Sequence, residues 1–224
     1  MAYDVSIFVG KFKRPMSRTY SNLSCFYGNY ATASVNIEGK SKWGLIDKGG
    51  NEVIPPMYDY AIYKGEDVVY VNNGLNCSTF RKKTVTKNRT IGLWEENYIM
   101  GKWGIVNLKN ELIVPFTYSR LNPFGDGYIS ASLGKKAGLI TAYGERITPF
   151  KYDLILPIRR DYEIYFALIK PSGSGVIDSK GNFVLEPIYS GIGVNCSNDE
   201  DGWIVVNKGN ETFYIDKQWK RCCL

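Results

Sequence analysis

The chain has 224 residues, of which 44% are hydrophobic and 22% are charged, and this composition excludes general disorder. It contains no histidine, which excludes Ser-His-Asp and Cys-His nucleophile systems, HExxH zinc sites and imidazole general bases. Twenty-eight basic and 22 acidic residues leave a net charge of +6, a mild bias toward acidic partners.

Residues 1–19 precede the repeating pattern, and we expect them to form an N-terminal strand or cap. Their apolar run, Val5–Val9, is shorter than the apolar core of a secretory signal, which has roughly 7–15 residues. It is also shorter than a membrane span, which needs about 20 apolar residues. The five cysteines are odd in number and lack CxxC spacing, which favours reduced thiols over disulfides or a metal cluster. We therefore expect a cytoplasmic protein without membrane contact, cofactor or metal.

From residue 20 onward one pattern recurs along the chain. It is clearest where the segment 43–47, Trp-Gly-Leu-Ile-Asp, returns at 103–107 as Trp-Gly-Ile-Val-Asn. Weaker copies centre on Gly138 and Gly175, and a degenerate last copy ends at Asp216. Each of the four glycines is followed 14 residues later by a tyrosine, with proline shortly before it; the tyrosines are Tyr58, Tyr118, Tyr152 and Tyr189. Four ungapped matches indicate an internal repeat.

Each copy is predicted to open with a β-hairpin. Glycine within a strand marks the close approach of a neighbouring tryptophan or backbone, because glycine lacks a Cβ atom. An acceptor side chain stands three residues before a glycine or asparagine, which is the signature of a type I turn; these acceptors are Asp47, Asn107, Thr141 and Asp178. A second short strand follows, and we expect proline to end it because proline has no N–H donor for the ladder.

The other half of each unit is predicted to contain a half-buried strand. Residues 31–37 and 129–133 alternate between apolar and polar, and residues 164–168 keep the same spacing. The predicted fold is therefore all-β, a repeat protein of about five three-stranded units. The pattern begins at Tyr20 and stops near Trp219, and it leaves open both a closed propeller-like ring and a linear β-repeat stack.

One segment of the repeat domain, which covers residues 20–224, departs from the repeat length. This insertion, at 72–101, contains five positive charges and no acid within residues 81–89. Insertions in repeat scaffolds map to loops on one face, which is often the binding face. The binding residues we predict are Arg81, Lys82, Lys83, Lys87, Arg89 and the stacking aromatic Trp94. A solvated β-hairpin whose lysines serve solubility is the alternative.

These motifs resemble the bacterial WG repeat family, whose units read lysine, tryptophan, glycine, aliphatics, aspartate, then glycine and a proline-tyrosine. Residues 42–58 match this pattern closely, and residues 102–118 are a second good match. The resemblance covers about residues 20–219 and implies a β-rich scaffold that acts as an interaction module. It supplies no catalytic residues. Trp43 and Trp103 are expected to be packing residues, since repeated aromatics build continuous cores.

Three functions are compatible with these observations. The first is a non-catalytic scaffold that binds another protein through the repeat surface and the basic insertion, in bacterial defence, toxin immunity or regulation. The second is a nucleic-acid or polyanion-binding module that uses residues 81–89. The third is a carbohydrate-binding or glycoside-cleaving ring, which requires two opposed carboxylates. Asp47 and Asp178 are candidates, but their turn positions already explain them, and we expect no enzyme. The partner's identity and the oligomeric state are not predicted.

Overall fold

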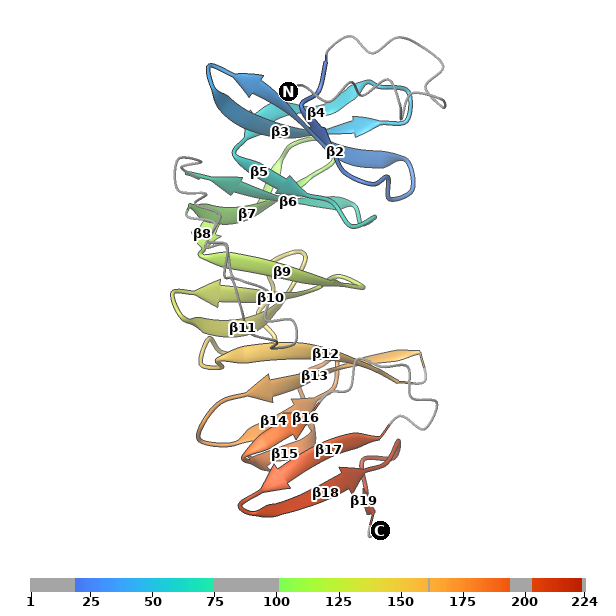
Figure 1. Ribbon diagram of the computed structural model, residues 1–224, viewed down its shortest axis with the longest axis vertical. Coiled ribbons are helices and arrows are strands. Elements are labelled where there is room, and N and C mark those ends of the chain that lie inside the picture. Colours follow the sequence, from blue (N-terminus) through green and yellow to red (C-terminus); the bar gives the residue numbers. More distant parts are fainter. Residues whose placement is uncertain (1–18, 75–100, 161, 194–202, 223–224) are drawn as a thin grey trace, which may run out of the picture. The chain divides into compact units, whose positions relative to one another are not determined.

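The computed structural model describes residues 19–74, 101–160, 162–193 and 203–222 (Figure 1). These residues form nineteen strands in five small antiparallel sheets, which confirms the predicted all-β repeat fold. Each sheet consists of strands that follow one another in the chain, and no closed barrel forms among the described strands. No described segment is a helix long and apolar enough to cross a bilayer. The chain divides into two compact units, 1–120 and 121–224.

The first unit contains two four-stranded sheets. The first sheet has the order β1 (Asn22–Leu23), β2 (Tyr30–Ile37), β3 (Lys40–Asp47) and β4 (Glu52–Tyr58). The second has the order β5 (Tyr60–Ile62), β6 (Val68–Asn73), β7 (Lys102–Asn107) and β8 (Leu112–Tyr118). Only Asp59 separates the last strand of the first sheet from the first strand of the second.

The second unit contains three sheets. The third sheet has three strands, β9 (Arg120–Gly125), β10 (Tyr128–Leu133) and β11 (Lys136–Thr141), with isolated bridges at Arg146 and Tyr152 where a fourth strand would lie. The fourth sheet contains β12 (Leu154–Arg160), β13 (Glu163–Ile169), β14 (Ser174–Ile177) and β15 (Phe183–Tyr189). The fifth contains β16 (Gly191–Gly193), β17 (Ile204–Lys208), β18 (Glu211–Ile215) and β19 (Arg221–Cys222).

The repeat unit therefore has four strands in four of the five sheets, where three strands were predicted from the sequence. The additional strand follows each motif tyrosine directly, as β5 follows Tyr58 and β16 follows Tyr189. Two of these strands are only three residues long, too short to show a period of two. They are defined by pairing with the next strand, as in the bond from the Asp59 N–H to the Asn72 carbonyl at 3.0 Å.

The prediction that the motif proline ends its strand is wrong for the first, second and fourth sheets, where the proline lies within the strand. In the first sheet Trp43 pairs with Tyr58 and Leu45 pairs with Ile54, so a step of two residues on β3 matches a step of four on β4. The two extra residues form a bulge, and Pro55 and Pro56 occupy it. A bulged position needs no ladder donor, so proline is tolerated there.

The motif glycine is required by this bulge. A Cβ atom on Gly44 would lie 2.3 Å from the carbonyl oxygen of Ile54. The same contact recurs at Gly104, where the Val114 oxygen would be 2.7 Å away, and at Gly175. This confirms the predicted close approach of backbone. The 14-residue spacing from glycine to tyrosine is thus the length of one turn and one bulged strand.

The predicted turns are also confirmed. Asp47 Oδ1 accepts the backbone N–H groups of Gly49 and Asn51 at 2.8 and 2.9 Å. Gly50 closes the turn at φ 81°. Acceptor bonds of the same kind are made by the side chains of Asn107, Thr141, Asp178 and, in the degenerate last copy, Asp216.

Within each unit, successive sheets pack face to face. In the first unit Leu45 and Ile54 of the first sheet share a core with Val69 and Val71 of the second. In the second unit β13 buries both of its faces. Phe166 and Leu168 pack in the core shared with the third sheet, and Ala167 packs in the core shared with the fifth.

Candidate interaction site

An aromatic ladder joins the two sheets of the first unit. The ring of Tyr60 lies 5.0 Å from that of Trp43 and 6.0 Å from that of Trp103, between centroids. Trp103 is 3% exposed, so its predicted packing role is confirmed. Trp43 packs against the core shared by the first two sheets but keeps part of its surface exposed. The two motif tryptophans therefore link the first sheet to the second through Tyr60.

A motif tyrosine makes a second link between these sheets. The hydroxyl of Tyr58 donates to the side-chain oxygen of Asn110 at 2.6 Å, which connects the first copy's tyrosine to the second copy's turn. Burial raises the pKa of Tyr58 and outweighs the hydrogen bond to Asn110, so the hydroxyl stays a neutral donor at neutral pH.

A lysine before the motif tryptophan is paired with an aspartate after the motif tyrosine. Lys42 Nζ lies 2.6 Å from Asp59 Oδ1, and the Asp59 side chain is largely buried. Lys136 and Asp153 form the same pair at the same repeat positions, with more exposed side chains. Because solvent screens the exposed pair more, we expect the Lys42–Asp59 pair to be the stronger of the two.

Asp59 also holds one end of the insertion. Its second oxygen, Oδ2, accepts the N–H of Gly74 at 2.7 Å. Gly74 and Gly101 are both in left-handed conformations, with φ 90° and 112°, and face each other across the base of the insertion. A Cβ atom on Gly101 would lie 2.5 Å from Asn72 Oδ1, so only glycine fits at this position.

Asn72 lies directly beneath this base and is fully buried. Among the described residues, neither its Oδ1 nor its Nδ2 atom has a hydrogen-bond partner. An unsatisfied buried amide costs about 1–3 kcal/mol of stability. The chain therefore carries a destabilising group next to Asp59, Gly74 and Gly101. We name Asp59, Asn72, Gly74 and Gly101 the insertion root.

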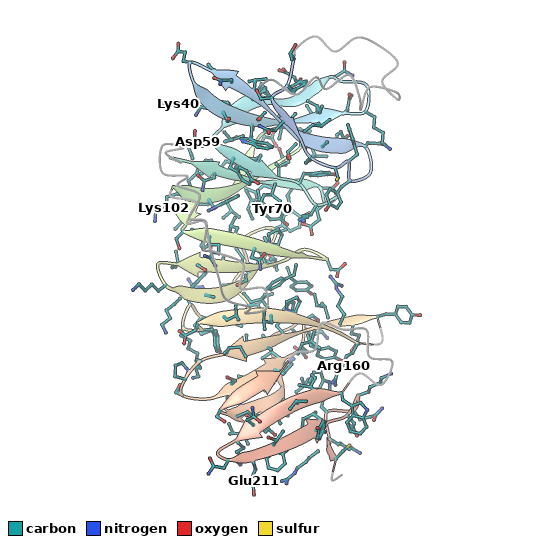
Figure 2. All side chains as sticks on the ribbon, in the orientation of Figure 1. Lys40, Asp59, Tyr70, Lys102, Arg160 and Glu211 are labelled. Carbon is teal, nitrogen blue, oxygen red and sulfur yellow. The ribbon has the colours of Figure 1, made fainter. Side chains whose placement is uncertain are left out.

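The insertion takes the place of a two-residue turn. In the first sheet Ile37 pairs with Lys40, and only residues 38–39 connect β2 to β3. At the same position in the second sheet Asn73 pairs with Lys102, and residues 74–101 connect β6 to β7. Figure 2 shows Lys40, Asp59 and Lys102 along one edge of the first unit. Two lysines therefore lie on the edge from which the basic insertion begins.

A family model described as WG containing repeat matches residues 43–72, 103–136 and 175–211. The chain contains WG repeats. The three matches begin at Trp43, Trp103 and Gly175, the positions where the structure forms the glycine-bearing strand of the bulged hairpin. No curated protein matches the chain.

The predicted binding residues of this WG-repeat protein lie outside the described residues. They are Arg81, Lys82, Lys83, Lys87, Arg89 and Trp94. The structure describes only the root from which their segment begins and ends. Sequence reasoning missed Asp59 and Asn72 at this root. The joint recurrence of Lys42 with Asp59 and of Lys136 with Asp153 is the signal that would have pointed to the aspartate.

The carboxylates considered for glycoside chemistry serve turns in the WG-repeat protein. Hydrogen bonds, above all from the Asn51 side chain, hold the pKa of Asp47 below its ordinary value. Partial burial would raise the pKa of Asp178, but the bonds from Asn182 outweigh it and the pKa is lowered. Both groups are therefore ionised acceptors at neutral pH. In the described part of the chain no three His, Cys, Asp or Glu side chains cluster as metal ligands would.

Proposed function

We propose that this WG-repeat protein is a non-catalytic scaffold in the cytoplasm that binds another protein through its repeat surface and its basic insertion. The insertion root is the observation that supports this proposal most. Asp59 binds Gly74 and Lys42 together, and the paired glycines bring the two ends of a long segment to one hairpin position. A segment whose ends are fixed on a rigid sheet loses less conformational entropy when it binds.

Two further observations support a scaffold. The sheets bury their apolar faces against one another through the described core residues, so the repeat domain has a core without the insertion. The absence of histidine excludes imidazole acid–base catalysis, and Asp47 and Asp178, the two carboxylates considered for glycoside chemistry, serve turns. The match to the WG repeat also supports a role as an interaction module.

Nucleic-acid or polyanion binding is the second candidate. Residues 81–89 carry five positive charges, and Lys40 and Lys102 lie on the edge where the insertion begins. A phosphate-bearing ligand would show a steep loss of affinity with salt, with a slope of about −0.9 for each phosphate contact on duplex DNA. A protein partner would be retained at physiological salt.

The test replaces Arg81, Lys82, Lys83, Lys87 and Arg89 by serine. The matched control replaces five exposed lysines elsewhere; these are Lys48, Lys109, Lys135, Lys180 and Lys208. Both variants lose the same charge. Partners are captured by chemical cross-linking in cells that express the protein and identified by mass spectrometry. In parallel, duplex DNA and heparin are titrated by fluorescence anisotropy over a range of salt concentrations.

We expect the insertion variant to keep the wild-type melting temperature and to lose a protein partner that the control variant retains. Capture that survives in the insertion variant would contradict a role for the basic segment. DNA or heparin binding that depends steeply on salt and disappears only in the insertion variant would instead favour the second candidate, a nucleic-acid or polyanion-binding function.

A further inference from the structure

A fully exposed tyrosine stands at the tip of a hairpin in the second unit. The strands β12 and β13 pair without interruption from Leu154–Ile169 to Arg160–Glu163, so the chain reverses over two residues. Tyr162 is the second of them, and its relative exposure of 112% means that its ring is not covered on any side. An aromatic ring with this exposure leaves a large apolar surface in water.

The backbone of Tyr162 is in a conformation that tyrosine disfavours. Its φ angle is 67°, in the left-handed region where a Cβ atom clashes with backbone. Two-residue hairpin turns favour glycine or asparagine at such positions. The chain follows this preference in the turn between β2 and β3, whose second residue is Gly39 at φ 79°. Tyr162 therefore occupies the tip at a cost in backbone strain.

The hairpin is held firmly just beneath its tip. Arg159 binds the carboxylate of Asp126 and donates to the Phe124 carbonyl at 2.9 Å. Arg160 is 7% exposed, stacks over Trp219 at 4.2 Å, and donates to the carbonyl of Asp216 at 2.8 Å. Figure 2 labels Arg160 at this end of β12. The exposed ring thus projects from a braced support and would lose little freedom on binding.

We propose that Tyr162 is an anchor residue that inserts into an apolar pocket on a protein partner. The proposal rests on the proposed function as a protein-binding scaffold and adds a contact in the second unit. A ring that is exposed on every side can bury its whole surface only in a concave receptor. Tyrosine is among the residues that dominate binding energy in such pockets. Arg159 and Arg160, the cations just beneath the tip, already bind the Asp126 carboxylate and the Asp216 carbonyl, which disfavours a nucleic-acid phosphate as their ligand.

The partner is identified with a photo-reactive probe. Benzoylphenylalanine is placed at position 162, at position 94 in the insertion, or at position 143, where Tyr143 is a second exposed tyrosine of the same unit. Adducts formed in cells that express the protein are identified, and the adducted protein is purified for affinity measurements. We expect the adduct at 162 and none at 143.

The affinity of that purified protein is then measured for Tyr162→Gly, Tyr162→Phe and the control Glu38→Gly. Glu38 also has a positive φ, of 52°, in a two-residue hairpin turn. Tyr162→Gly should weaken binding about 30-fold or more, because the anchor ring is lost. Tyr162→Phe, which keeps the ring, should stay within about fivefold. Glu38→Gly should leave affinity within about twofold.

Thermal stability separates an anchor from a structural residue. Tyr162→Gly relieves the left-handed strain and should melt at the wild-type temperature or up to about 4 °C above it. A lower melting temperature, or an affinity within about twofold of wild type, would overturn the proposal. An adduct at position 94 without one at position 162 would overturn the proposal that Tyr162 is an anchor and would leave the proposed scaffold function unaffected. No protein adduct at either site would overturn both.

Discussion

At the scale of single residues, the repeat is built around one steric contact. The bulged partner strand brings the Ile54 carbonyl to where the Cβ atom of any residue other than glycine at position 44 would lie. The prolines in the bulge remove donors that would otherwise be unpaired. Glycine, proline and tyrosine are thus required by a single hairpin geometry, and that is why their spacing recurs.

Gly44→Ala should destabilise the protein by about 3 kcal/mol, because the new methyl group meets backbone atoms that cannot move without shifting β4. Chemical denaturation with urea measures this loss. Gly193→Ala is the control, since its Cβ atom would meet the nearest atom at an ordinary 3.5 Å. The control should lie within about 0.5 kcal/mol of wild type. Equal stability of the two variants would contradict the steric account.

The turn aspartates make stability depend on pH. The pKa of Asp47 is lowered in the folded state, so its contribution is complete above its ordinary value of 3.8 and is lost as pH falls through the lowered value. Asp47→Asn keeps the acceptor oxygen, as Asn107 does naturally. The fall in melting temperature between pH 5 and about pH 2.5 should therefore be smaller in Asp47→Asn than in wild type. An identical fall would show that Asp47 does not contribute.

At the scale of elements, the aromatic ladder connects sheets that the backbone joins only through Asp59. Tyr60 contacts both motif tryptophans, one from each sheet. Sequence reasoning treated the two tryptophans alike, because both occupy the same motif position. Their burial differs, since Trp103 is 3% exposed whereas Trp43 keeps part of its surface in solvent.

Trp103→Ala should cost about 3–5 kcal/mol, the usual loss for a buried aromatic side chain. Trp43→Ala should cost less, about 1–3 kcal/mol, because part of its ring is already exposed to solvent. Equilibrium unfolding by urea, followed by circular dichroism, gives both values. If Trp43→Ala proved the more damaging change, the ladder would not be the main role of these residues.

At the scale of the whole molecule, the five sheets and the insertion have different requirements. The sheets depend on face-to-face packing of alternate residues, whereas the insertion depends on a root that holds its ends together. The root includes a buried amide, Asn72, that has no hydrogen-bond partner among the described residues, and such a group opposes folding. Such groups are kept in proteins where they have a use outside stability, which accords with the proposed binding role.

Replacing residues 74–101 by Asn-Gly should leave the repeat domain folded. The replacement restores the two-residue connection found between β2 and β3, and it shortens a loop whose length has only a weak effect on stability. The far-ultraviolet circular dichroism spectrum and the melting temperature should stay close to those of wild type. Loss of cooperative unfolding would show that the segment belongs to the core, and the scaffold proposal would need revision.

The sequence by itself determined the all-β class, the five repeats, the turn acceptors and the close approach at the motif glycine. These features are local: a period of two, a turn of four residues and a missing Cβ can each be recognised within one repeat. The tertiary structure alone decided the fourth strand, the course of β4 through its prolines and the exposure of Tyr162. A three-residue strand and a bulge are defined by their hydrogen bonds to the partner strand, and segments this short show no period of two in the sequence. The exposure of Tyr162 depends on its place at the tip between two paired strands.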